Sequence, residues 1–386
     1  MKELFKNHIP LMKPWLGTEE WEVLKDVILS GWVSQGPKVQ EFEQAIASFV
    51  GVKYAVATNS CTSAIHLSLR CLGVREGDEV ILSDFTCMAD ANAVIMAGAT
   101  PVFVDIDEKT FNIDPVKTEQ AISEKTKAIL VVDQIGLPAD LDTFIEIAKK
   151  HNLRLVDDAA TSLGAKYKGR YLGANGVTTM YSFHPRKMIT TGEGGMLITY
   201  DKNIAEQAKI LRASGASVSD LERHKAKGII LQKYYVNGYN YRMTDIQAAI
   251  GLVQMKKLPD IIRMRNEQAE YYTQAFSEIK ELETPLVPKY ATHAFSSYLL
   301  KIRKGEEIKP KEIINKLAEK NISCRFGIQP LHKEPYFNNR NFSEDDYPVT
   351  NDVAKRSFFI PIFPGLLKED MDHIIDSLKE IFNEST

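Results

Sequence analysis

A lysine in a glycine-rich stretch is the first residue that could carry chemistry. Residues 182–187 read Ser-Phe-His-Pro-Arg-Lys, and residues 190–195 read Thr-Thr-Gly-Glu-Gly-Gly. A strand that runs into a turn would hold Lys187 rigidly, as a Schiff-base lysine requires. Taken alone, a lysine is more often a solvated surface residue. A phosphate loop at the glycines is rejected, because such a loop opens a helix whereas residues 196–199 favour a strand.

A pair of aspartates marks the end of another strand. Asp157 and Asp158 close the apolar run 153–157, and Ala159 and Ala160 follow. A carboxylate at the carboxyl end of a strand faces the ligand crevice of an α/β sheet, and small neighbours leave room for a flat ring. Such an acid would keep a pyridinium nitrogen protonated, which supplies the electron sink of pyridoxal phosphate (PLP) chemistry. Capping of a following helix is an equally weighted alternative.

A hydroxyl-rich segment at residues 58–64 joins a third strand to an apolar helix. Backbone N–H groups at the start of that helix, with the hydroxyls of Thr62 and Ser63, would bind a phosphate. Ordinary N-capping by Ser or Thr is the default alternative. Together the three segments predict one site with a phosphate cradle, a ring-nitrogen carboxylate and a strand-end lysine.

The elements that must position these residues alternate along the chain. We predict seven strands, at residues 54–58, 79–82, 101–105, 128–133, 153–157, 177–183 and 196–199. Helical patterns lie between several of them, at residues 63–72, 89–97, 115–123 and 141–151. This alternation favours a mainly parallel sheet covered by helices on both faces.

The flanking segments predict further helices and a second domain. Thr18 could cap one helix, and Pro37 and Gly51 bracket another. Residues 244–257 favour a long helix that ends at Pro259. From about Pro285 the pattern changes to a strand at 297–302 and helices at 309–320 and 368–382. We predict a large α/β domain over residues 1–260 and a smaller α+β domain over residues 261–386.

Composition narrows the classes of protein. The 386 residues are 44% hydrophobic and carry a net charge of −3, with no basic stripe for nucleic acid. The four cysteines have neither Cys-x-x-Cys nor zinc-site spacing, so we expect no metal and a reducing cytoplasm. No signal peptide or membrane helix is expected.

At this point the motifs resemble a known family, the DegT-type nucleotide-sugar aminotransferases. The matching phrases run through most of the chain, at residues 31–32, 36–37, 42–43, 77–81, 101–107, 157–160, 182–195, 238–243 and 330–332. The resemblance implies the PLP-transferase type I fold, as in aspartate aminotransferase. It has a mainly parallel seven-stranded sheet and a smaller C-terminal α+β domain.

The resemblance also implies roles for single residues. Lys187 would form the Schiff base with PLP and act as acid and base on the substrate carbon. Asp158 would pair with the pyridine nitrogen. Thr62, Ser63 and Ser182 would hold the phosphate.

Three further cofactor-binding positions follow from the resemblance. Asn240 would reach the phosphate across a dimer interface, so that a homodimer shares its active sites. Cys87 stands where the family often has an aromatic residue stacked on the ring. Thr161 stands where it often has Gln or His beside the ring hydroxyl.

The implied reaction moves an amino group, from glutamate by family analogy, onto a nucleotide-linked keto-deoxyhexose, with the 4-keto carbon favoured. One alternative is a PLP-dependent sugar dehydratase, but those relatives carry His in place of the lysine, which Lys187 argues against. A second alternative is a non-enzymatic regulator of the same fold. The acidic balance and the absence of a helix-turn-helix phrase speak against contact with DNA.

Overall fold

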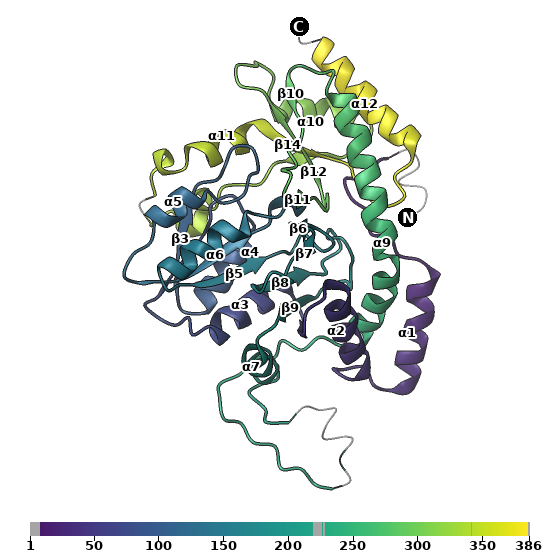
Figure 1. Cartoon of the computed structure of the whole chain (residues 1–386). Coiled ribbons are helices and arrows are strands. Elements are labelled where there is room, and N and C mark those ends of the chain that lie inside the picture. Colours follow the sequence, from purple (N-terminus) through teal and green to yellow (C-terminus); the bar gives the residue numbers. More distant parts are fainter. Residues whose placement is uncertain (1–7, 219–225, 227, 341, 385–386) are drawn as a thin grey trace.

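The computed structural model describes residues 8–218, 226, 228–340 and 342–384. A seven-stranded sheet lies at its centre (Figure 1). Its strands are β1 (Tyr54–Thr58), β2 (Glu79–Ser83), β3 (Thr100–Val104), β4 (Thr126–Val132), β5 (Arg154–Asp158), β8 (Thr178–Ser182) and β9 (Gly195–Thr199). Their order is β1-β9-β8-β5-β4-β2-β3. Only β9 runs antiparallel to its neighbours in this sheet, which confirms the mainly parallel α/β fold.

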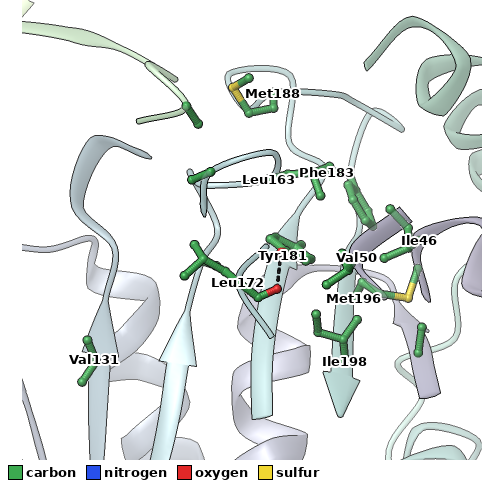
Figure 2. Packing of buried hydrophobic residues seen from close by; sticks show 14 of the residues in the cluster. Ile46, Val50, Val131, Leu163, Leu172, Tyr181, Phe183, Met188, Met196 and Ile198 are labelled. Carbon is green, nitrogen blue, oxygen red and sulfur yellow. Dashed lines mark hydrogen bonds between the residues drawn. The ribbon is translucent and has the colours of Figure 1, made fainter. Parts of the chain in front are cut away.

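Helices cover both faces of this sheet. They are α2 (Pro37–Val50), α3 (Cys61–Cys71), α4 (Met88–Met96), α5 (Pro115–Gln120), α6 (Leu141–Lys150) and α7 (Lys202–Arg212). Adjacent side chains of β9 point to opposite faces, as strand geometry requires. Leu197 packs in the core that holds α3, whereas Met196 and Ile198 pack in the core that holds α2. Figure 2 shows the second of these cores, where the Tyr181 hydroxyl donates a hydrogen bond to the Leu172 carbonyl.

Two N-terminal helices begin with different signals. Helix α2 begins at Pro37 and is followed by Gly51 in the left-handed conformation, as predicted. The predicted capping role of Thr18 is wrong. Thr18 is the first residue of α1 (Thr18–Ser30), and Gly17 occupies the cap position. The Glu20 carboxylate accepts the Gly17 N–H at 2.7 Å, and glycine has no side chain to accept an N–H of the first turn.

The prediction that a helix ends at Pro259 is also wrong. Helix α9 extends over 32 residues (Asp245–Phe276), with Pro259 inside it. An interior proline costs a helix about 3 kcal/mol. Burying a large apolar side chain contributes roughly 1.5–3 kcal/mol, and α9 buries Leu258 and Ile261 in one core and Tyr272 and Phe276 in another. Tertiary packing therefore overrides the local break.

The C-terminal half of α9 belongs to a second core. There it packs against a four-stranded antiparallel sheet of β10 (Leu282–Glu283), β12 (Tyr298–Ile302), β14 (Ser357–Ile360) and β13 (Arg325–Phe326). Helices α10 (Pro310–Glu319), α11 (Pro348–Arg356) and α12 (Lys368–Asn383) complete this α+β region. Ile9 also packs in this core. The domain division at residue 260 falls within α9 and stays a prediction.

Short elements connect the two regions. A three-stranded sheet joins β6 (Lys166–Tyr167) and β7 (Arg170–Tyr171) to β11 (Ala291–Thr292). Four 3-10 turns are η1 (Gln134–Gly136), η2 (Leu331–Lys333), η3 (Pro335–Phe337) and η4 (Glu344–Asp346). Among the described residues, no helix has the length and apolar character needed to cross a membrane.

Arg265 of α9 fastens the helix to two loops of the smaller region. Its guanidinium is fully buried and donates to the carbonyls of Phe295, Ser296 and Ile362 at 3.0–3.2 Å. Burial lowers the pKa of Arg265 to about 9. Because Ser296 and Ile362 line the cavity described next, Arg265 sets the position of one cavity wall.

Candidate active site

A cavity of about 690 Å³ lies at the carboxyl ends of the parallel strands, where an α/β sheet binds its ligands. The larger region supplies most of it. The smaller region supplies a wall from β13, β14 and the loop after β13. Six of the eight cofactor-binding residues predicted from the sequence line this cavity: Thr62, Cys87, Asp158, Thr161, Ser182 and Lys187.

The turn that presents Lys187 is held from both ends. It follows β8, and the next two residues, Met188 and Ile189, are buried in the core below it. The Thr190 hydroxyl and the Thr191 N–H both donate to the Phe183 carbonyl, at 2.9 and 3.0 Å. Lys187 is left half-buried with its side chain on the cavity.

The glycines after this turn allow a close backbone approach. Gly192 has φ +83°, a conformation that favours glycine. A Cβ atom at Gly195 would lie 2.4 Å from the Ser60 carbonyl oxygen, because β9 runs directly against the start of α3. The glycine-rich stretch therefore brings the lysine turn and the phosphate-cradle segment together, and Gly195 opens a strand as the sequence predicted.

The start of α3 has the features of an anion cradle. Ser60 caps the helix, and its Oγ accepts a hydrogen bond from the Ser63 N–H at 3.2 Å. Ser60, Cys61 and Thr62 line the cavity, and the first-turn N–H groups of a helix favour an anion. Ser63 lies differently: its hydroxyl donates to Asn59 Oδ1 at 2.7 Å and is not on the cavity. Phosphate binding by the Ser63 side chain stays a prediction without support from this geometry.

The aspartate pair at the end of β5 splits between two environments. Asp158 lines the cavity and accepts the Ala160 N–H at 3.0 Å, with the Cys61 Sγ at 3.7 Å. Asp157 is fully buried away from the cavity and accepts the Thr179 hydroxyl at 3.0 Å. Burial raises the pKa of both carboxyls, to about 7 for Asp157. At Asp158 the charge of Lys187 opposes this rise in pKa, and both side chains line the cavity.

Two predicted ring contacts also lie on the cavity. Thr161 Oγ1 donates to the Asp133 carbonyl at 2.8 Å, which fixes the loop after β5. Cys87 is exposed at the cap position of α4. Neither Thr161 nor Cys87 can stack on a ring as an aromatic side chain would. Their contacts with a cofactor stay predictions.

Asn240 is exposed and does not line the cavity formed by its own chain. Its backbone nevertheless runs beside the cradle, since the Asn59 N–H donates to the Tyr241 carbonyl at 2.9 Å. The sequence offered no reason for this segment to lie near the site of its own chain, and the structure places its backbone there. The cross-subunit contact of Asn240 stays a prediction.

The phrase at residues 330–332 fastens a loop of the smaller region to the sheet. His332 Nδ1 lies 2.6 Å from Asp84 Oδ2, and the His332 N–H donates to the same carboxyl at 2.8 Å. Asp84 directly follows β2, and its carbonyl accepts the Leu331 N–H. Leu331 is thereby held on the cavity wall.

Sequence reasoning assigned no role to Asp90 or to two arginines of the cavity. Asp90 lies in the first turn of α4, is 1% exposed, and forms with Asp158 what we name the acidic floor. Arg186 and Arg325 are exposed and form what we name the basic rim. The only sequence signal for Asp90 was an acid in the first turn of a helix, which is easily taken for an ordinary favourable charge at a helix start.

The chemistry and position of these residues fit pyridoxal phosphate. The start of α3 offers N–H groups and hydroxyls that can bind a phosphate. The buried Asp158 carboxyl can pair with a cationic group, and Lys187 lines the same cavity. Asp158 accepts the Ala160 N–H and lies beside Cys61, and its carboxylate charge suits a further cationic N–H. The fold and the site define a PLP-dependent transferase of the α/β type.

Comparison with known proteins gives the family. A profile of the DegT/DnrJ/EryC1/StrS aminotransferase family matches residues 14–379. The chain therefore belongs to that family. It is 39% identical over 380 residues to the spore coat polysaccharide biosynthesis protein SpsC of Bacillus subtilis, covering 97% of this chain and 98% of SpsC.

Solved structures agree with this assignment. The PLP form of Spr1654 from Streptococcus pneumoniae superposes with a TM-score of 0.90 at 28% identity, covering 98% of this chain and 100% of the other. PseC of Helicobacter pylori, an aminotransferase involved in the biosynthesis of pseudoaminic acid, gives the same TM-score, identity and coverage. The chain is a PLP-dependent sugar aminotransferase.

Bound PLP supplies the electron sink that stabilises negative charge on the substrate carbon. The chain's own residues supply the rest. Asp158 would hold a proton on the ring nitrogen by its negative charge, the start of α3 would hold the phosphate, and Lys187 would move a proton at the reacting carbon.

Proposed function

We propose that this enzyme transfers the amino group of glutamate to a nucleotide-linked keto-deoxyhexose, with the 4-keto carbon favoured. In the balanced reaction the keto oxygen of the sugar is exchanged for the amino group and hydrogen of the donor, and the donor leaves as a 2-oxo acid. The SpsC relative is named for polysaccharide biosynthesis, a use that fits an amino-deoxy sugar. The unbridged cysteines fit a cytoplasmic reaction.

The basic rim is the observation that carries the nucleotide linkage. Arg325 Cζ lies 4.6 Å from the Phe359 ring centre, which holds the guanidinium beside the cavity. Arg186 lies close enough for its charge to add to burial in lowering the pKa of Arg325. No carboxylate is paired with either guanidinium among the residues that the structure describes. Two unneutralised guanidiniums at one opening favour an anionic substrate such as a sugar diphosphate.

A homodimer with shared sites belongs to the same proposal. After α7, the described residues 216–218 and 228–236 extend away from the sheet (Figure 1). Among them, Ile229, Leu231 and Tyr235 are 95, 80 and 73% exposed. Helix α1 likewise exposes Trp21 and Leu29. Large exposed apolar side chains in two segments favour an interaction surface, and a two-fold dimer would cover the same surface on both subunits.

The alternative of a sugar dehydratase keeps the cofactor and replaces the lysine by His. Lys187 on the cavity argues against it. The alternative of a regulator needs no reaction at all. Visible absorbance of bound cofactor, followed by turnover with a keto sugar and glutamate, would exclude a cofactor-free regulator.

Incubation with a panel of nucleotide-linked 4-keto and 3-keto deoxyhexoses tests the substrate. With glutamate as donor, we expect mass spectrometry to find an amino sugar from the 4-keto compounds and 2-oxoglutarate in equal amount. Matched sugar 1-phosphates that lack the nucleotide serve as controls. Equal turnover of these controls would refute the nucleotide linkage, and amination of only the 3-keto compounds would refute the preferred carbon.

Mixing two inactive variants tests the shared site. In a heterodimer of Lys187→Ala and Asn240→Ala chains, one shared site would carry both lesions and the other would be intact. We expect activity to return in part after subunit exchange. Lack of recovery in confirmed heterodimers would mean that each chain builds its site alone.

A further inference from the structure

Asp90 is a buried acid for which the reaction described so far has no use. It lies in the first turn of α4, is 1% exposed and lines the cavity with Asp158 and Lys187. Its Oδ2 accepts the Thr86 hydroxyl at 2.5 Å. Its Oδ1 is buried and has no hydrogen-bond donor among the described residues. A buried carboxyl oxygen without a donor is costly, so its surroundings need an explanation.

The neighbour of Asp90 is a second carboxyl. The side chains of Asp90 and Asp158 lie within hydrogen-bonding reach of each other. Two ionised carboxylates at this range would repel each other in a site with little water, whereas one proton between them turns the contact into a hydrogen bond. The pair therefore shares a proton.

The surroundings decide which carboxyl keeps it. Asp158 accepts the Ala160 N–H and Cys61 in addition to facing Lys187, whereas Asp90 accepts only Thr86 among the described residues. Burial, and next the negative charge of Asp158, raise the pKa of Asp90 well above its ordinary value. At Asp158 the hydrogen bond with Asp90 and the charge of Lys187 oppose the effect of burial. These contacts favour Asp90 as the carboxyl that keeps the proton.

We propose that Asp90 is a positioning residue that stays a neutral carboxylic acid and donates a hydrogen bond to Asp158. The bond keeps Asp158 ionised although it is buried, so that Asp158 can hold a proton on the cofactor's ring nitrogen. This inference rests on the role proposed for Asp158. A neutral donor is suited to the task because it stabilises the carboxylate without adding a charge that would compete for the ring nitrogen.

Substitutions at Asp90 separate this role from a merely structural one. Asp90→Asn keeps a donor, since the amide N–H can replace the acid O–H. Asp90→Leu removes the donor at similar volume. Thr86→Val is the matched control, because it removes the Thr86 bond to Asp90 and leaves the contact between the two carboxyls.

The readout is the nitrogen-15 NMR shift of ring-labelled PLP in the holoenzyme, followed against pH. This shift reports directly whether the ring nitrogen carries a proton. We expect Asp90→Asn and Thr86→Val to titrate as the native enzyme does. In Asp90→Leu the ring nitrogen should lose its proton at a pH lower by about one unit or more, the size typical of losing one hydrogen bond to a charged group. An unshifted Leu variant, or an Asn variant shifted as far as Leu, would overturn the proposal.

A second measurement covers failure of the Leu variant to fold. The infrared spectrum of the native protein at neutral pH should contain the carbonyl band of a protonated carboxylic acid that is missing in Asp90→Asn. No difference at this band would overturn the proposal. Asp158→Asn in the same NMR experiment tests the proposed role of Asp158, on which this inference rests. If the ring nitrogen of that variant titrates as in the native enzyme, Asp158 does not hold the proton on it. A shift in Asp158→Asn with none in Asp90→Leu would refute only the role of Asp90.

Discussion

The acidic floor and the basic rim of the cavity hold their charges in opposite ways. Asp158 and Asp90 are at most 5% exposed and sit at the ends of elements packed in the main core. Arg186 and Arg325 are exposed and come from the two different regions of the chain. A charge in the floor acts at low dielectric and has a large effect, whereas a charge at the rim is screened by solvent. We therefore expect changes in the floor to affect the chemical step and changes at the rim to affect substrate binding.

The largest effect is expected at Lys187. If Lys187 attaches the cofactor and moves the proton as predicted, Lys187→Ala should lower transamination by roughly 10³-fold or more. The visible absorbance of the bound cofactor should change with it. Steady-state assays and absorption spectra measure both, with exposed Lys202→Ala as the control. An active Lys187→Ala enzyme would mean that the reacting lysine lies elsewhere.

The next effect separates the two adjacent aspartates. Asp158→Asn should retain PLP but lose the counter-charge of the ring nitrogen. Losing a charged partner shifts a pKa by ~1–3 units, which corresponds to a fall in kcat of roughly 10- to 10³-fold. Asp157→Asn, on the core side of β5, should affect kcat far less. If Asp157→Asn is the more damaging change, the wrong acid has been assigned to the cofactor.

Smaller changes are expected at the rim. Arg325→Ala should raise the KM for a nucleotide-linked sugar by roughly fivefold, because a partly exposed ion pair contributes about 1 kcal/mol. The kcat and the absorption spectrum of the cofactor should stay unchanged, and the rise in KM should become smaller as salt is added. Arg263→Ala, an exposed arginine on α9, is the control. A fall in kcat at unchanged KM would place Arg325 in the chemical step instead.

The smallest effect concerns stability and pH. Burial raises the pKa of Asp157 from its ordinary value of 3.8 to about 7. The folded chain then keeps a proton that the unfolded chain releases, so this group makes stability fall as the pH rises from about 4 to about 7. Asp157→Asn should show a smaller fall than the native apoprotein. Urea unfolding at pH 5 and pH 7 measures it, and an equal or larger fall in the variant would contradict the assignment.

The sequence predicted the central sheet well because its signals are local. Apolar runs bounded by turn residues place β1 at its observed bounds, and Pro37 and Gly51 mark both ends of α2. The prediction that α9 ends at Pro259 was wrong because the signals that keep the helix intact are not local. The packing that keeps α9 helical comes from residues in two cores far apart in sequence.

The candidate site was predictable only where its residues follow strands. Asp158 ends β5, and Lys187 lies in the turn that follows the adjacent strand β8, so topology brings them together. Asp90 acts through a carboxyl 68 positions away, and Arg325 enters from the second region. Such contacts depend on how loops and regions pack against each other, which a periodic pattern does not encode. The same holds for a contact between subunits, as at Asn240.

Borohydride reduction of the native holoenzyme, followed by peptide mass mapping, tests the central claim most directly. The account predicts that a single peptide gains the mass of reduced cofactor and that fragmentation places it on Lys187. Modification of a different lysine, or no modification of a protein that still transaminates, would contradict the account.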